Sequence, residues 1–371
     1  MMPVSKPSIG PEELQEVGKV FDTGWLGLGS TVFEFENMIK EYLGAKNVIA
    51  VNTGTTALHI ALDASGISEG DEVIVPSLTF CASVQVITSL RAIPVFCEVE
   101  PDTLNMDIGD VKKRITRKTK AIMPVHYCGR SCDMDGLLKI GKEREIHIIE
   151  DAAHAFGSSY KGRKIGSFGN AACFSFDPIK NLTCGEGGAV ALDDDATAEL
   201  IRTKRILGID KDTWHRYRNE RAWFYEVTTQ GYRYHMSNIN AAIGIAQLRK
   251  VGLFIQKKKD IVKKYNDAFM SINGLKILSW DLKESAPFTY ILRVLFGKRE
   301  ALIEFLKERG VGSGIHYIPN HLQPFFKPFT SSLPVTERLG EEILTLPLYY
   351  DMTDEQVSSV IKAVSDFFKR K

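Results

Sequence analysis

Short apolar runs alternate with amphipathic stretches along the first two thirds of the chain. Runs with the length of buried strands lie at residues 47–51, 72–75, 93–96, 121–125, 146–149, 171–176 and 188–192. Between them, the spacing of apolar positions predicts helices over residues 11–22, 33–43, 57–62, 82–90, 137–144 and 238–251. Strands that alternate with helices predict an α/β fold, with a mostly parallel central sheet and helices on both of its faces.

The last third of the chain repeats this pattern in a shorter series. We expect helices over residues 260–270, 299–310 and 353–368, a strand over 288–296, and a strand and loop over 314–319. Three consecutive lysines at 257–259 are typical of a solvated helix face. The pattern therefore predicts a large domain of residues 1–250, with an N-terminal helical segment, and a smaller C-terminal α/β domain of residues 251–371.

Polar and glycine-containing segments follow several of the predicted strands. They are the turn at 52–56, the segment 77–80, the segment 151–154 and the loop that carries Lys180. Ligands bind at the carboxyl ends of the strands in open α/β sheets, so these segments are expected at one edge. Taken alone, Lys180 is an ordinary surface lysine with an apolar stem. Its place among these segments favours an amine nucleophile that forms an imine with a carbonyl compound or cofactor.

Charge and cysteine content narrow the classes of function. Among 371 residues, 47 lysines and arginines face 46 aspartates and glutamates, which leaves a net charge of +1. This balance provides no basic surface for nucleic acid or for an anionic membrane. There is no apolar leader and no apolar run of spanning length, so we expect a cytoplasmic protein. Six scattered cysteines without a C-x-x-C pair are expected as reduced thiols, and His126, Cys128 and Cys132 lack a fourth ligand for zinc.

One basic and aromatic segment, residues 214–224, stands out in this neutral chain. Three interpretations are open: a nucleic-acid arm, a loop over a phosphorylated ligand or at a subunit contact, and a solvated loop. The neutral surroundings favour the solvated loop over the other two.

The predicted edge of the sheet offers each group that an aldehyde cofactor with a phosphate tail needs. Lys180 is the amine, and Asp151 ends a buried strand, where its carboxylate can keep a pyridine nitrogen protonated. Phe80 can stack on a flat ring, although an aromatic residue there is more often part of the core. His154 can reach the phenolic oxygen of the ring. A helix N-terminus and hydroxyls can hold the phosphate, and the donors expected are Gly54, Thr55 and Ser175. Taken alone, the turn at 52–56 is equally consistent with plain N-capping by Thr53 or Thr55.

These residues stand in motifs that resemble the DegT/DnrJ/EryC1/StrS family of sugar aminotransferases, which use pyridoxal 5'-phosphate. The motifs occur in order over nearly the whole chain, and any one of them alone is weak. They are Gly-Trp-Leu at 24–26 with Gly-Ser at 29–30, Asn-Thr-Gly-Thr-Thr at 52–56, Pro-Ser-Leu-Thr-Phe at 76–80, Glu-Asp-Ala-Ala-His at 150–154, the Lys180 loop ending in Gly-Glu-Gly-Gly at 185–188, Gly-Tyr-x-Tyr-x-Met at 231–236, His-Tyr-x-Pro-x-His at 316–321 and Leu-Pro-Leu-Tyr at 346–349.

The resemblance implies the aspartate-aminotransferase-like fold (fold type I), with the cofactor bound by residues 1–250. It implies a homodimer with shared active sites, L-glutamate or glutamine as amino donor, and a nucleotide-linked keto-6-deoxyhexose as acceptor, with a 4-keto sugar favoured over a 3-keto sugar. The product would serve surface-polysaccharide (for example lipopolysaccharide) or secondary-metabolite biosynthesis. The cofactor-binding roles are those given above, and the residues implied for the sugar and its nucleotide are Trp25, Gly29, Ser30, His316 and Tyr317.

The chain departs from the family pattern at three positions. Arg233 stands where the family has an asparagine that reaches the cofactor phosphate across the dimer, and as a charged donor it is expected to bind the same phosphate. His235 replaces an arginine. Asp177 stands where many members have histidine. Two alternatives to transamination remain. One is a sugar dehydratase, whose known relatives replace the lysine with histidine, so that Lys180 argues against it. The other is a catalytically silent regulator that binds the cofactor.

Overall fold

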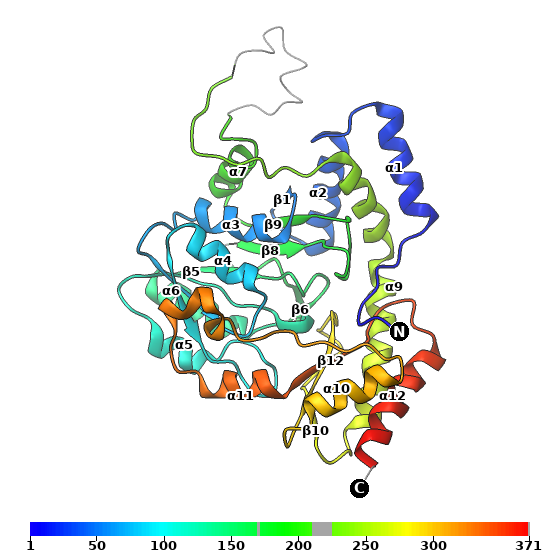
Figure 1. Ribbon diagram of the computed structural model, residues 1–371. Helices are drawn as coiled ribbons and strands as arrows, with labels where there is room; N and C mark the ends of the chain where they lie inside the picture. The colour runs from blue at the N-terminus through cyan, green and yellow to red at the C-terminus, as the bar shows by residue number, and fades with distance from the viewer. Residues whose placement is uncertain (169–170, 210–224, 370–371) are drawn as a thin grey trace.

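A computed structural model describes residues 1–168, 171–209 and 225–369 and is built around a seven-stranded sheet (Figure 1). The basic segment at 214–224 lies outside the described residues. Strands of this sheet follow the order β1-β9-β8-β5-β4-β2-β3. Their bounds are β1 Asn47–Val51, β2 Glu72–Pro76, β3 Ile93–Cys97, β4 Thr119–Ile122, β5 His147–Asp151, β8 Ala171–Ser175 and β9 Gly188–Leu192.

Strands β8, β5, β4, β2 and β3 run parallel, and β9 is antiparallel to both of its neighbours. The predicted mostly parallel α/β sheet is therefore confirmed. The helices of this part of the chain are α1 Pro11–Thr23, α2 Ser30–Leu43, α3 Gly54–Ala64, α4 Cys81–Ser89, α5 Ile108–Arg114, α6 Met134–Arg144 and α7 Asp195–Lys204, with the 3-10 turn η1 Tyr127–Gly129. A small hairpin joins β6 Ser159–Tyr160 to β7 Arg163–Lys164.

Alternate side chains of the strands enter different hydrophobic cores on the two faces of the sheet. In β1, Val48 and Ala50 pack in the core that contains α2 and the first half of α9 (Asn238–Phe269). Ile49 and Val51 point the other way, into the core beneath α3, α4 and α7. Both faces of the sheet are thus covered, as expected for runs that are apolar at every position.

A second, smaller sheet forms the C-terminal part of the chain, in the order β10-β11-β12. All its neighbouring strands are antiparallel, and it shares a core with α10, α12 and the second half of α9. The elements are β10 Leu275–Ile277, β11 Tyr290–Val294, β12 Ile343–Leu346, α10 Arg299–Glu308, α11 Pro334–Glu342, α12 Asp354–Lys369, η2 Asn320–Leu322 and η3 Pro324–Phe329.

Helix α9 connects the two sheets without a break (Figure 1). The sequence predicted two helices here, but the lysine run at 257–259 does not interrupt the helix. That run is also not uniformly solvated, because Lys258 is only 5% exposed. The expected domain boundary near residue 250 falls within α9, and the division into 1–250 and 251–371 stays a prediction.

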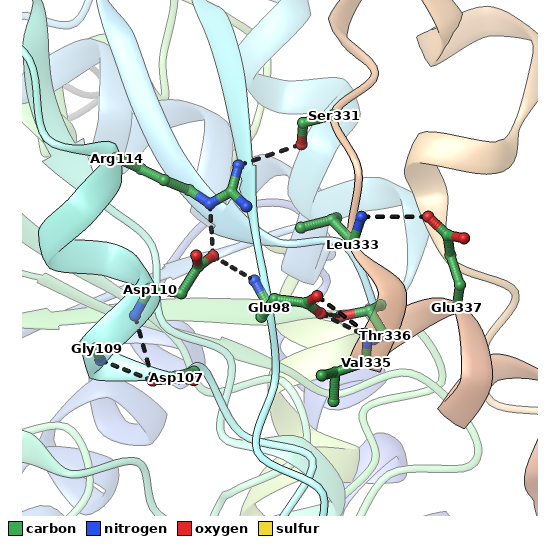
Figure 2. A network of polar contacts seen from close by, with 10 residues as sticks. All are labelled: Glu98, Asp107, Gly109, Asp110, Arg114, Ser331, Leu333, Val335, Thr336 and Glu337. Atoms are coloured by element: carbon green, nitrogen blue, oxygen red, sulfur yellow. Dashed lines mark hydrogen bonds and ion pairs between the residues drawn. The ribbon is translucent and has the colours of Figure 1, made fainter.

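Helix α11 is held against β3 by the carboxylate of Glu98 (Figure 2). Glu98 accepts hydrogen bonds from the Val335 and Thr336 amides at 3.0 and 2.8 Å and from Thr336 Oγ1 at 2.6 Å. A carboxylate that satisfies the free amides of a helix N-terminus replaces the missing side-chain cap. The same helix leads directly into β12, so this contact fixes the small sheet relative to the large one.

Several of these elements were not predicted from the sequence. They are α5, α7, α11, β6, β7, β10 and β12. Strand β4 begins two residues before the predicted 121–125 run and ends at Ile122, and Val125 only forms an isolated bridge to Asp151. Within the described residues, no helix combines the length and the apolar character needed to cross a membrane.

Candidate active site

A cavity of about 320 Å³ opens at the carboxyl ends of the parallel strands. This volume falls within the range of small-molecule sites. Of the residues expected from the sequence, the cavity is lined by Gly54, Thr55, Phe80, Asp151, His154, Ser175, Lys180, His316 and Tyr317, and Asp177 lies there as well. The strand-end rule correctly gathered the turn at 52–56, Phe80, the segment 151–154 and the Lys180 loop, whereas His316 and Tyr317 were expected only from the resemblance.

Lys180 lies in the loop between β8 and β9. The Asp177 carbonyl accepts a hydrogen bond from the Lys180 amide at 3.1 Å, which closes a tight turn. The Lys180 Nζ lies 4.4 Å from the centre of the Phe288 ring. Burial lowers the pKa of the Lys180 amine, and the Asp177 and Asp151 carboxylates oppose that effect. A lysine in this setting is easier to deprotonate than a surface lysine, as an amine nucleophile requires.

Asp151 ends β5 and is buried, with 4% of its surface exposed. One oxygen accepts a hydrogen bond from Ser83 Oγ at 2.6 Å, and the other accepts one from the Ala153 amide at 3.1 Å. Burial raises the pKa of the carboxyl, against the effect of these hydrogen bonds and of Lys180. A buried carboxyl of this kind is poised to pair with a cationic ring nitrogen.

His154 is stacked on Phe288, with ring centres 4.3 Å apart. Its Nε2 lies 3.1 Å from the Tyr317 hydroxyl, and its Nδ1 is buried with no hydrogen-bond partner among the described residues. Burial, together with Lys180 and His316, holds the pKa of His154 well below its usual value. The ring is therefore neutral at pH 7.

The N-terminus of α3 lies against Ser175. Thr53 caps the helix and accepts a hydrogen bond from the Thr56 amide. The first amides of a helix have no partner within it, and here they include those of Gly54 and Thr55. A Cβ on Gly54 would come within 2.6 Å of the Ser175 Cβ, so only glycine permits this approach. Amides and a hydroxyl converge here in the arrangement of an anion cradle.

Phe80 and the 316–317 pair form the outer wall of the cavity. Phe80 is 51% exposed, and its ring centre lies 5.5 Å from that of Tyr317. His316 Nδ1 lies 2.9 Å from Thr345 Oγ1, and burial, with Lys180 nearby, lowers the pKa of this histidine. The wall is anchored behind by Asn320, whose Nδ2 donates to the Ser77 and Thr79 carbonyls at 3.1 and 2.7 Å.

Other residues expected at the site lie outside the lining of this cavity. Gly29 precedes α2, and Ser30 is its first residue. The Trp25 indole donates to the Leu28 carbonyl at 2.8 Å, and Asn238 Nδ2 donates to the Trp25 carbonyl at 2.9 Å. Arg233 is exposed and forms an isolated bridge with Ile206. His235, in the same 231–236 motif, forms an isolated bridge with Val51 at the end of β1. The binding roles expected for Trp25, Gly29, Ser30 and Arg233 stay predictions.

Two residues of the site were missed by sequence reasoning. Ser83, on α4, supports Asp151, and Phe288 lies between His154 and Lys180. Nothing in the local sequence marks either residue, because a serine in a helix and a phenylalanine near a strand are ordinary. Only the folded chain brings Ser83 to the cavity and Phe288 against His154 and Lys180. Among the described residues, no cluster of histidine, cysteine and acidic side chains has the geometry of a metal site.

A lysine, a buried aspartate and an anion cradle at the strand ends define an enzyme site suited to an aldehyde cofactor with a phosphate group. Comparison with known proteins identifies the family. Residues 7–365 match the model of the DegT/DnrJ/EryC1/StrS aminotransferase family. The chain belongs to this family and is an aminotransferase. The resemblance predicted from the motifs is thus confirmed.

Individual relatives cover nearly the whole chain. The spore coat polysaccharide biosynthesis protein SpsC of Bacillus subtilis is 39% identical over 99% of this chain and 97% of its own. Spr1654 of Streptococcus pneumoniae, in its PMP form, is 30% identical with a TM-score of 0.94, over 100% of both chains. Helicobacter pylori PseC, an aminotransferase involved in pseudoaminic acid biosynthesis, is 26% identical with a TM-score of 0.92, over 100% of both chains. Fold type I and pyridoxal phosphate as the family's cofactor are confirmed.

The residues of this chain fit pyridoxal phosphate. The cradle at Gly54, Thr55 and Ser175 offers donors for a phosphate. The carboxylate of Asp151 suits a protonated ring nitrogen, and His154 Nδ1 is a buried polar atom still without a partner. Each chemical feature of the cofactor thus has a counterpart among the side chains of one cavity.

Proposed function

We propose that this protein is a pyridoxal-phosphate-dependent aminotransferase that moves an amino group from L-glutamate to a nucleotide-linked keto-6-deoxyhexose. A 4-keto sugar is favoured over a 3-keto sugar. The observation that carries the proposal is the meeting of Lys180, Asp151 and the Gly54–Ser175 cradle in one cavity. The names of SpsC and PseC support a role in the biosynthesis of an aminosugar for a polysaccharide or glycan.

The cofactor would be held at three places. Thr55, with the neighbouring Gly54 amide, and Ser175 Oγ would hold its phosphate at the N-terminus of α3. Asp151 would keep a proton on the ring nitrogen, with Ser83 fixing the carboxylate. Phe80 would cover one ring face, and His154 would face the phenolic oxygen. When bound, pyridoxal phosphate supplies an aldehyde for amines and a ring that draws electrons from the reacting carbon.

Lys180 would act as both anchor and proton carrier. Its Nζ would hold the cofactor through the aldehyde carbon, and when the substrate amine takes its place the freed amine would move a proton. The lowered pKa of Lys180 suits this second role, since a neutral amine is needed to accept a proton at pH 7. The neutral ring of His154, held near Tyr317, adds no positive charge beside the lysine.

The substrate would enter past the outer wall of the cavity. His316 and Tyr317 would face the sugar, and Trp25, Gly29 and Ser30 would border the entrance for its nucleotide. We further propose a homodimer in which Arg233 of each subunit reaches the cofactor phosphate of the other. This arrangement would account for an exposed Arg233 that lies outside the cavity of its own chain. A cytoplasmic location is part of the same proposal.

The test is a panel of substrates. The enzyme loaded with pyridoxal phosphate is given glutamate and UDP-, dTDP- or GDP-linked 4-keto and 3-keto sugars, and amination is followed by mass spectrometry and NMR. We expect one 4-keto sugar to be aminated, with release of α-ketoglutarate, and Lys180→Ala to abolish turnover. Full turnover by Lys180→Ala would refute the proposal. Release of α-ketoglutarate without sugar amination would favour a dehydratase. If glutamate does not convert the bound cofactor, the result would favour a silent regulator.

A further inference from the structure

A second lysine is buried behind the site. Lys258, on α9, is 5% exposed, and its Nζ donates a hydrogen bond to Asn181 Oδ1 at 2.9 Å. Among the described residues, no carboxylate lies within ion-pair distance of it. Burial, with Lys180 adding to the effect, lowers the pKa of Lys258 to about 7. A buried ammonium without a counter-ion is costly, and the roles assigned above do not account for it.

Asn181 connects this lysine to the proposed nucleophile. It directly follows Lys180 in the chain and is itself 4% exposed. Its Nδ2 donates to the Ala286 carbonyl at 3.1 Å and to the Phe156 carbonyl at 3.4 Å, which leaves its oxygen facing Lys258. The amide group is thus fixed on both sides. Through Asn181, Lys258 therefore helps to fix the backbone next to Lys180.

Different charged groups lie on the two sides of the loop that carries Lys180. A void of about 20 Å³, enough for about one water molecule, lies between the two lysines. Its lining includes Lys180, Lys258, Lys6 and Tyr350. Lys6 lies 3.9 Å from Asp351, so its charge is balanced at the surface. On the cavity side, Lys180 faces the carboxylates of Asp177 and Asp151, with the Cys128 thiol also near. The neutral rings of His154 and His316 complete that side.

We propose that Lys258 is a positioning residue for Lys180: it fixes the lysine loop through Asn181 and, while it is protonated, its positive charge favours the neutral, nucleophilic form of the Lys180 amine. The carboxylates of Asp151 and Asp177, on the cavity side, act in the opposite sense, because they favour the charged form of Lys180. The ammonium of Lys258, behind the loop, offsets them without occupying the cavity. This inference rests on the role proposed for Lys180 above.

The test is a pH titration of the visible absorbance of the cofactor attached to Lys180. In Lys258→Met, loss of the positive charge should raise the absorbance midpoint by about one pH unit. Lys258→Arg keeps the charge and should retain the wild-type midpoint. In Asn181→Asp a carboxylate beside Lys258 balances its charge, so the midpoint should also rise. Lys257→Met, one residue away on the partly exposed face of α9, is the matched control and should not shift it.

An unchanged midpoint in Lys258→Met would overturn the inference, and so would equal shifts in Lys258→Met and Lys258→Arg, which would show a packing effect. Asn181→Asp decides the question if Lys258→Met fails to fold. The wild-type protein separates the two proposals. If it shows no pH-dependent visible band with pyridoxal phosphate, the role of Lys180 fails, whereas a normal band with no shift in the variants refutes only the role of Lys258.

Discussion

Replacing Lys258 with methionine should stabilise the fold at low pH. The pKa of Lys258 falls from 10.5 in an exposed setting to about 7 in the fold. Between these values the unfolded chain binds a proton that the folded chain does not, so stability rises with pH across this window. Below pH 7 both states are protonated, and the fold carries the full cost of burying the charge. At about 1.4 kcal/mol per pH unit, that cost is about 5 kcal/mol.

Methionine removes this cost and also one favourable contact. Asn181 Oδ1 loses its donor, which costs about 1–3 kcal/mol for a buried acceptor. At pH 6 the variant should therefore be more stable than the wild type by about 2–4 kcal/mol. Near pH 10 the wild-type lysine is neutral in the fold, so the advantage should vanish and leave only the lost hydrogen bond.

The measurement is urea unfolding of the wild type, Lys258→Met and Lys257→Met at pH 6, 8 and 10. Differences between the proteins cancel the pH effects that all three share. Lys257 is partly exposed, with Asp354 at 4.0 Å, and its replacement should change stability little at any pH. A Lys258→Met protein that is less stable than the wild type at pH 6, or a difference that does not depend on pH, would refute the reasoning.

Three further changes test other parts of the structure. Glu98→Gln removes the charge that satisfies the N-terminus of α11 and should cost about 1–2 kcal/mol in urea unfolding; an unchanged midpoint would contradict the capping role. Gly54→Ala places a Cβ within 2.6 Å of the Ser175 Cβ, so affinity for pyridoxal phosphate in a fluorescence titration should fall about tenfold or more; equal affinity would contradict the cradle. Asp151→Asn leaves the cavity shape intact but removes the charge that keeps the ring nitrogen protonated, so kcat should fall about a hundredfold or more in steady-state assays, and a wild-type kcat would contradict the assigned role.

Much of the fold could be predicted because both faces of the large sheet are buried. That condition produces continuous apolar runs in the strands, and the helices between them show their own period. The rule that parallel strands end at one edge then placed Lys180 beside Asp151 and His154, although the Lys180 loop and the segment 151–154 follow different strands. The structure brings these three residues to one cavity.

What the sequence could not show depends on contacts between distant segments. The lysine run at 257–259 resembles a solvated face, because sequence alone does not reveal which side of α9 meets the Lys180 loop. Lys258 is buried where Asn181, 77 positions away, supplies its acceptor. Phe288 reaches His154 across a still longer separation in the chain. The helix α11 was missed because its N-terminus is satisfied by Glu98 from another part of the chain rather than by a capping residue of its own.

The central claim is that Lys180 is the amine that holds the cofactor. Reduction of the protein with borohydride in the presence of pyridoxal phosphate traps the amine attached to the aldehyde, and peptide mapping by mass spectrometry locates it. The account predicts the added cofactor mass on Lys180, with the buried amine of Lys258 unmodified. Attachment at Lys258 or at another lysine, with Lys180 unmodified, would contradict it.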